Sequence, residues 1–165
     1  MTKVELFGNK VLEGGEISAD EGMLLYEQPL QELCAKADEI RRFFCSNQFD
    51  ICAIINGKSG RCSENCRFCA QSAHNHTGAA EYALLGAEEI VEQAKIHDQQ
   101  GILRYSIVTS GKRLSDDEID LMCEAVRQIG KETRLSMCIS FGLLNKEQYQ
   151  RLKESGVTRV HNNLE

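Results

Sequence analysis

Three closely spaced cysteines carry the most distinctive chemistry in this sequence. Cys62, Cys66 and Cys69 have the spacing C-x3-C-x2-C, which lets one loop hold several corners of a 4Fe–4S cubane through thiolates. Three ligands leave one of the four irons open. An open iron can chelate a ligand through an amine and a carboxylate, the groups that free methionine offers. We therefore predict a 4Fe–4S cluster here, with Phe68 placed to shield it or to pack on a cofactor ring.

A structural zinc site is the alternative for this loop, with His74 or His76 completing a Cys3His tetrahedron. Zinc loops usually add a distant second pair of ligands, and the sequence offers no such pair. The loop also follows an apolar run at residues 51–55, which reads as a buried strand, and barrel active sites gather at the carboxyl ends of strands. Both points favour the cluster, and we expect the two histidines to be exposed.

The composition indicates an ordinary globular protein. The chain has 165 residues, 42% of them hydrophobic and 27% charged. A formal net charge of −6 argues against a nucleic-acid surface, which needs a basic patch. No apolar run approaches the roughly 20 residues of a membrane span, and the first 15 residues lack the apolar core of a secretory signal. We therefore expect a cytoplasmic protein without a nucleic-acid or membrane partner.

Eight cysteines are unusual for such a protein, and in a reducing compartment clustered cysteines indicate metal more often than disulfides. Cys34, Cys45 and Cys123 fall in helical patterns and are predicted to be small buried hydrophobes. Cys52 has two interpretations. It is a buried core cysteine, or it faces the same side of the sheet as Cys138 and supplies a metal ligand.

Glycine-punctuated strands and helices alternate along the second part of the chain, which indicates parallel βα units. We predict strands at 51–55, 103–109, 134–140 and 158–164, helices at about 86–100, 115–130 and 145–156, and two earlier helices that begin at Ser18 and after Pro29. The fold class is thus α/β, the N-terminal half of a (β/α) barrel of the TIM type. Residues 1–48 are expected to form a helical extension and residues 49–165 an incomplete barrel core, because a full barrel needs eight strands.

The residues around the cysteines resemble the signature of biotin synthases, which belong to the radical S-adenosylmethionine (SAM) superfamily. Residues 56–72 read N-G-K-S-G-R-C-S-E-N-C-R-F-C-A-Q-S, close to the family pattern I-K-S-G-x-C-x-E-x-C-x-x-C-x-Q-S. Segments 104–106, 137–142 and 161–165 agree in order and spacing. The resemblance extends from about residue 18 to the end and implies the N-terminal portion of such an enzyme.

The resemblance implies a set of cofactors and partners. The loop cysteines would bind the 4Fe–4S cluster, which delivers an electron to SAM. The resulting 5′-deoxyadenosyl radical would abstract hydrogen from dethiobiotin, and an auxiliary cluster (2Fe–2S or a variant) would donate sulfur to form biotin. The resemblance also implies an electron donor such as flavodoxin or ferredoxin, and a homodimer of the full-length protein. No acid–base catalytic residue is assigned.

Several further residues acquire roles from the resemblance. Asn163 matches an asparagine near both SAM and the substrate's ureido ring, and Glu165 matches an acidic position that binds the SAM ribose. Ser110 ends the second strand, where radical SAM enzymes contact the methionine amine. Without the resemblance, Asn163 and Glu165 would be read as a polar turn at a strand end.

One ligand position departs from the family. Cys138 matches an auxiliary-cluster cysteine, but a second such position holds Ser106, and an alkoxide is a harder, more basic ligand than a thiolate. Either the auxiliary cluster has other ligands or another composition, or the sulfur-donating site is lost. The alternatives to a biotin synthase are a hydrogenase-maturase-like or methylornithine-synthase-like enzyme, or a non-catalytic cluster-binding fragment. We expect no turnover from the 165 residues alone.

Overall fold

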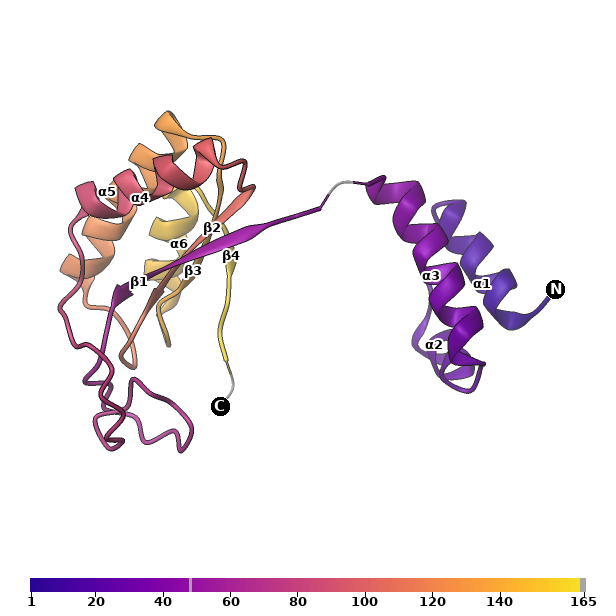
Figure 1. The fold of residues 1–165 in the computed structure, drawn as a ribbon, viewed down its shortest axis with the longest axis horizontal. Coiled ribbons are helices and arrows are strands. Elements are labelled where there is room, and N and C mark those ends of the chain that lie inside the picture. The colour runs from indigo at the N-terminus through magenta and orange to yellow at the C-terminus, as the bar shows by residue number, and fades with distance from the viewer. Residues whose placement is uncertain (48, 164–165) are drawn as a thin grey trace. The chain divides into compact units, whose positions relative to one another are not determined.

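The computed structural model describes residues 1–47 and 49–163. They fall into two compact units, Met1–Phe49 and Asp50–Glu165, each of which is described by itself. The second unit contains a four-stranded parallel sheet in the order β1-β2-β3-β4 (Figure 1). Its strands are β1 (Cys52–Lys58), β2 (Arg104–Thr109), β3 (Ser136–Ser140) and β4 (Val157–Val160). Helices α4 (Ala87–Gln99), α5 (Asp116–Glu132) and α6 (Lys146–Ser155) connect them in turn.

Local sequence signals explain where the helices begin. Ser115 and Asn145 cap α5 and α6. In each helix the cap side chain accepts the N–H of the third helical residue, and the side chain of that residue accepts the backbone N–H of the cap, which completes a capping box. Gly101 follows the last turn of α4 in a left-handed conformation, with φ of 79°. Helix α5 continues past Gly130 to Glu132, so the expected end was two residues early.

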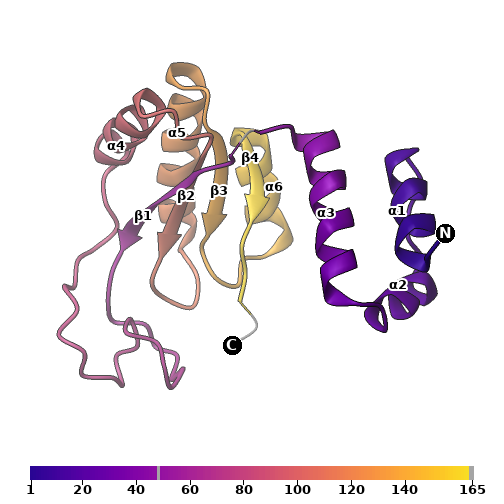
Figure 2. The same ribbon diagram turned by 45° about the vertical axis from the view of Figure 1, so that its right-hand side comes forward.

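The three connecting helices pack on one face of the sheet, as the two views in Figures 1 and 2 show. Alternate strand residues such as Tyr105, Ile107 and Ile139 are fully buried against them. Met122, Val126 and Ile129 of α5 complete the same core with no exposed surface. Period-two alternation in the strands and an apolar stripe on α5 therefore produce one continuous core.

The opposite face of the sheet carries the other set of strand residues. In the parallel register, Cys52 lies beside Arg104, and Ser106 lies beside Cys138. A shift of register between Met137 and Cys138 then places Arg159 beside Cys138. This register places Arg104, Ser106 and Cys138 on one face of the sheet.

The first unit consists of three helices, α1 (Lys3–Leu12), α2 (Ala19–Tyr26) and α3 (Leu30–Cys45). Helices α2 and α3 begin where the sequence predicts, whereas α1 was not predicted. Thr2 and Glu5 form a capping box that starts α1, and Val4 and Phe7 are its buried contacts. A Thr-x-x-Glu pattern at the very start of the chain was the available signal.

Two cysteine predictions on α3 are wrong. Cys34 and Cys45 are exposed, and only Cys123 of the three helical cysteines is buried. The described residues of the first unit cover the apolar stripe of α3 only in part, and no residue of this helix is buried. No helix within the described residues is long and apolar enough to span a bilayer.

Candidate functional site

The cysteine loop occupies residues 59–85, between the end of β1 and the start of α4. It lies beyond the carboxyl ends of the strands, as Figure 2 shows. The backbones of Ser59 and Tyr82 exchange two hydrogen bonds of 3.1 Å, which close the base of the loop. The hydroxyl of Tyr82 also donates to the carbonyl oxygen of Asn56 at 2.8 Å. The loop is thus anchored to the strand that it leaves.

A short backbone bridge holds Cys62 against the later part of the loop. The Cys62 N–H donates to the Gln71 carbonyl, and the Ala73 N–H donates to the Cys62 carbonyl, each at 2.9 Å. Arg61, just before it, has φ of 54°, a left-handed conformation that non-glycine residues adopt rarely. The exposed Arg61–Glu81 ion pair at 2.8 Å lies beside this turn.

Two side chains of the Gln71-Ser72 pair fix the same region. The Gln71 Oε1 accepts the Gly60 N–H at 2.5 Å and lies 3.0 Å from the hydroxyl of Ser59. The buried Ser72 hydroxyl donates to the Glu64 carbonyl at 2.8 Å. These contacts give a structural reason for the two residues that the signature contains.

The middle of the loop, residues 66–75, is a series of tight turns. The Cys69 N–H donates to the Cys66 carbonyl at 3.1 Å, the Ser72 N–H to the Cys69 carbonyl at 3.3 Å, and the Asn75 N–H to the Ser72 carbonyl at 3.2 Å. Asn75 was not singled out by the sequence reasoning, since an asparagine in a polar stretch gives no specific signal.

All three loop cysteines are partly exposed, and soft thiolate ligands of this kind suit iron–sulfur clusters. No group of three or more His, Cys, Asp or Glu side chains that could hold a metal ion occurs within residues 1–47 and 49–163. Ligands of a single tetrahedral ion must all lie about 2.3 Å from one point. Ligands of a cubane bind different irons, so they need not converge in this way. The donor set and the single loop therefore fit a cluster.

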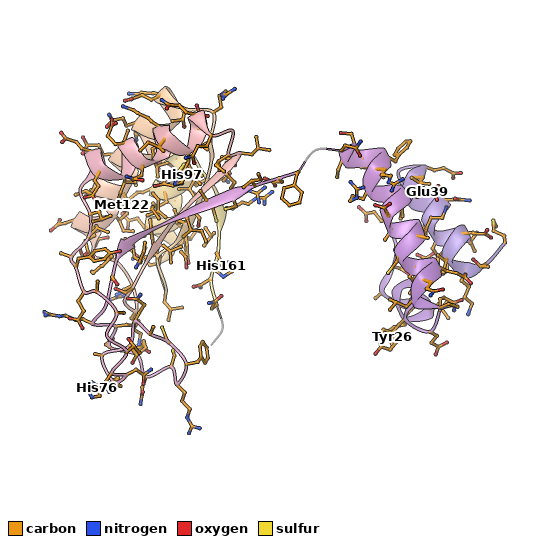
Figure 3. All side chains as sticks on the ribbon, in the orientation of Figure 1. Tyr26, Glu39, His76, His97, Met122 and His161 are labelled. Atoms are coloured by element: carbon orange, nitrogen blue, oxygen red, sulfur yellow. The ribbon has the colours of Figure 1, made fainter. Side chains whose placement is uncertain are left out.

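The aromatic and imidazole side chains of the loop are open to solvent. Phe68 is 77% exposed, so it contacts little of the protein in this structure. His74 and His76 are exposed, as predicted, and Figure 3 shows His76 at the far end of the loop from the helices. His97 is partly exposed, with its ring centroid 5.5 Å from that of Tyr105.

Ser110, at the end of β2, contacts the start of the loop. Ser110 is buried, its N–H donates to the Lys58 carbonyl at 2.9 Å, and its hydroxyl donates to the Gly60 carbonyl at 2.8 Å. Lys58 pairs with Glu118 of α5 at 2.6 Å. Burial raises the pKa of Glu118, but hydrogen bonds from Lys58 and the Ser115 N–H outweigh it and hold that pKa below its usual range.

The loops after β2 and β3 are joined to each other. Gly142, with φ of 75°, lies so close to the Lys112 carbonyl that a side chain would collide with it. The Leu143 N–H donates to the same carbonyl at 2.8 Å. Lys112 also lies 3.5 Å from a carboxylate oxygen of Glu64 in the cysteine loop. The three strand ends therefore share one connected rim.

A second group of predicted site residues lies within the sheet. Ser106 is buried and Cys138 is partly exposed on adjacent strands. Cys52 is exposed, so the buried-core interpretation of this residue is wrong. Its register with Arg104 puts it on the face that Ser106 and Cys138 share.

The chain after β4 continues from the loop end of the sheet. The His161 N–H donates to the Ile139 carbonyl at 2.8 Å, and the His161 ring lies 2.6 Å from the Asn163 side-chain oxygen. His161 is labelled in Figure 3. The strand predicted at 158–164 is shorter and ends at Val160. Glu165, the predicted ribose ligand, lies outside the described residues.

Comparison with known proteins connects this arrangement to a family. Residues 58–165 match the model of the radical SAM superfamily. The chain is 52% identical over 157 residues to a biotin synthase of Akkermansia muciniphila, covering 95% of this chain and 49% of that protein. It is 44% identical over 165 residues to a biotin synthase of Clostridium botulinum, covering 100% of this chain and 52% of that protein. The chain thus spans about half the length of the curated relatives it matches.

Solved structures share the fold at lower identity. A methylornithine synthase superposes with a TM-score of 0.68 at 23% identity, covering 94% of this chain and 46% of that one. An FeFe-hydrogenase maturase from Carboxydothermus hydrogenoformans gives 0.68 at 20% identity, covering 96% and 37%. Both likenesses show an α/β fold that corresponds to part of these larger enzymes. The family match over residues 58–165, with its cysteine loop at a strand end, places the chain in the radical SAM superfamily.

Proposed function

We propose that this chain is part of a biotin synthase, an enzyme that inserts sulfur into dethiobiotin. The observation that carries the proposal is the cysteine loop at the end of β1, within a chain that is 52% identical to a biotin synthase over 95% of its length. Gln71 and Ser72, which brace the loop, belong to the part of the signature that is specific to biotin synthases. The first unit would serve as a helical extension and residues 49–165 as the radical SAM core.

In this proposal, Cys62, Cys66 and Cys69 bind a 4Fe–4S cluster. When bound, the cluster supplies an electron to SAM, which yields methionine and a radical able to abstract hydrogen from an unactivated carbon. The chain's own contribution is to hold the three thiolates on one braced loop. The rim formed by Lys112 and Gly142 contacts this loop through the Lys112–Glu64 ion pair.

The SAM contacts are assigned to residues around the same loop. Phe68, with most of its ring exposed, is available to stack on the cofactor. Ser110 supports Gly60 through its hydroxyl, and it would stand next to the methionine amine. Asn163 and Glu165 follow β4 in sequence and would bind SAM, with Asn163 also contacting the substrate through its amide.

The auxiliary cluster, a 2Fe–2S cluster or a variant of it, is assigned to the open face of the sheet. Cys138 would be one ligand, and the buried Ser106 beside it would not replace the usual thiolate under ordinary conditions. Cys52 is a possible thiolate from the neighbouring strand. The cellular partners would be a reductant such as flavodoxin or ferredoxin and a second copy of the protein, in the reducing cytoplasm.

The test is anaerobic reconstitution of the full-length protein that contains this chain with iron and sulfide, followed by reduction in the presence of SAM. We expect methionine and 5′-deoxyadenosine from the wild type and from Cys34→Ala, but neither product from Cys69→Ala. Wild-type protein that binds zinc and no iron or sulfide would overturn the cluster assignment.

The substrate assignment needs a separate measurement, because the fold is also that of a methylornithine synthase. We expect a gene encoding this chain together with the remainder of its open reading frame to let a biotin auxotroph grow on dethiobiotin. SAM cleavage without growth, and without hydrogen transfer from dethiobiotin, would favour a related radical SAM enzyme.

A further inference from the structure

The turns between Cys66 and Asn75 form a series in which each ends where the next begins. Residues 66–69, 69–72 and 72–75 each close with an N–H to carbonyl bond between the first and last residue, at 3.1, 3.3 and 3.2 Å. The backbone bond from the Cys69 N–H to the Cys66 carbonyl spans the C-x2-C segment itself. A contact that joins the carbonyls of both cysteines adds a further constraint on their separation.

Asn75 supplies that contact by reaching back along the series. Its side-chain Nδ2 donates to the Cys69 carbonyl at 2.9 Å and to the Cys66 carbonyl at 3.2 Å. A primary amide nitrogen has two hydrogens, so one group satisfies both carbonyls at once. The side chain is partly buried, which shields these bonds from water.

We propose that Asn75 is a positioning residue for the cluster, acting through the backbone of Cys66 and Cys69. By holding two carbonyls with one amide, it fixes the spacing of the two thiolates that the C-x2-C segment presents. Its N–H groups also neutralise the negative ends of two backbone dipoles near an anionic cluster. Hydrogen bonding and charge around a cluster set its reduction potential, so both retention and potential should depend on this residue.

The inference rests on the cluster assignment of the proposed function, but not on the identity of the substrate. The sharpest variant is Asn75→Asp, which keeps the shape of the side chain and removes both donors. Its carboxylate would face two carbonyl oxygens. His76→Asp is the matched control, because it introduces the same negative charge one residue later. His76 is exposed and contacts neither carbonyl.

The experiment compares reconstituted proteins by the rate at which a chelator removes iron. We expect Asn75→Asp to lose iron about tenfold faster or more, since two acceptors lose their donors beside a new charge. We expect His76→Asp to remain within about twofold of the wild type. Asn75→Ala, which adds no charge, should show a smaller acceleration and a more negative cluster potential by redox titration. That variant also carries the test if Asn75→Asp fails to fold, as judged by circular dichroism.

The outcomes separate the two hypotheses. If the wild type binds no iron and sulfide, both the cluster assignment and the role of Asn75 are refuted. If the wild type binds the cluster and the Asn75 variants match it in iron release and potential, only the role of Asn75 is refuted. Equal acceleration in Asn75→Asp and His76→Asp would also refute it, because added charge alone would then explain the effect.

Discussion

Ser106 and Cys138 lie side by side in the parallel register of β2 and β3, one a hydroxyl and the other a thiol. Adjacent strands are about 4.8 Å apart, so these two side chains belong to the same local site. Their chemistry differs, because a serine hydroxyl stays protonated under conditions in which a thiol can become a metal ligand.

This difference gives a prediction for the proposed auxiliary cluster. We expect Cys138→Ala to abolish its absorption and electron paramagnetic resonance signals, whereas Ser106→Ala should preserve them because the hydroxyl is not a ligand. Both spectra should be recorded after the loop cluster has been accounted for by iron and sulfide analysis. Loss of the auxiliary signals in Ser106→Ala would show that the serine is a ligand after all.

Cys52 provides an independent test on the same face. If it replaces the missing thiolate, Cys52→Ala should lower auxiliary iron while leaving the loop cluster intact. Unchanged auxiliary spectra and turnover in Cys52→Ala would remove it from the ligand set.

The cysteines of the loop should bind iron, whereas the exposed cysteines of α3 should not. Cys66→Ser should reduce the iron that the reconstituted protein retains by roughly four atoms per chain, the content of one cubane. Cys45→Ser, at the end of α3, should have no effect, although its thiol is more exposed. Iron and sulfide per chain are the quantities to measure, and equal losses in both variants would indicate non-specific binding.

The rim makes a prediction about stability. Gly101 and Gly142 have nearly equal φ values of 79° and 75°, but only at Gly142 would a side chain meet the neighbouring backbone. Gly101→Ala should cost about 1 kcal/mol from backbone strain alone. Gly142→Ala should cost more than about 3 kcal/mol, because the carbonyl of Lys112 must move. Denaturant unfolding of both variants measures the difference, and equal costs would mean that the loops are not tightly joined.

Tyr105 makes a prediction about alkaline pH. Its hydroxyl is buried without a hydrogen-bond partner among the described residues, and burial raises its pKa from 10.0 to about 12. Because burial disfavours the phenolate, the free energy of unfolding should be independent of Tyr105 ionisation below pH 10 and should fall as the pH rises from 10 toward 12. The buried hydroxyl without a partner is a separate cost at neutral pH, so Tyr105→Phe should stabilise the protein there by about 1 kcal/mol.

The same variant should flatten the loss of stability above pH 10, as measured by denaturant unfolding at several pH values. Tyr149→Phe is the control of opposite sign, because the Tyr149 hydroxyl donates to the Gly142 carbonyl at 3.3 Å and its removal leaves that acceptor with one donor fewer. A Tyr105→Phe variant less stable than the wild type at every pH would contradict the prediction.

Much of the fold followed from local patterns. The interpretation that Cys52 faces the same side of the sheet as Cys138 agrees with the register, since a period of two leaves only two possible faces. Ser115 and Asn145 predicted helix starts because a capping box uses residues that are close in sequence. The helical stripe on α3 gave the wrong burial for Cys34 and Cys45. Periodicity identifies the face that can be buried, but it does not reveal how much partner surface is present to cover it.

For the candidate site, residue type and spacing predicted the ligands Cys62, Cys66 and Cys69, and that assignment stays a prediction. The residues that support the loop were not predicted. Asn75 was not predicted, because its contacts with the Cys66 and Cys69 carbonyls depend on how the loop folds back, and the residues next to Asn75 do not indicate this. The same holds for the contact of Ser110 with Gly60, which joins residues 50 positions apart.

The contact between Ser110 and Gly60 means that the cysteine loop cannot be transferred to another protein without losing part of its support. A graft of residues 59–85 onto another scaffold would carry the thiols, the Gln71 brace and the series of turns. It would leave behind the Ser110 hydroxyl that fixes Gly60 and the Lys112 ammonium group that lies beside Glu64. A transplant that also includes the end of β2, residues 109–113, would preserve both of these supporting contacts.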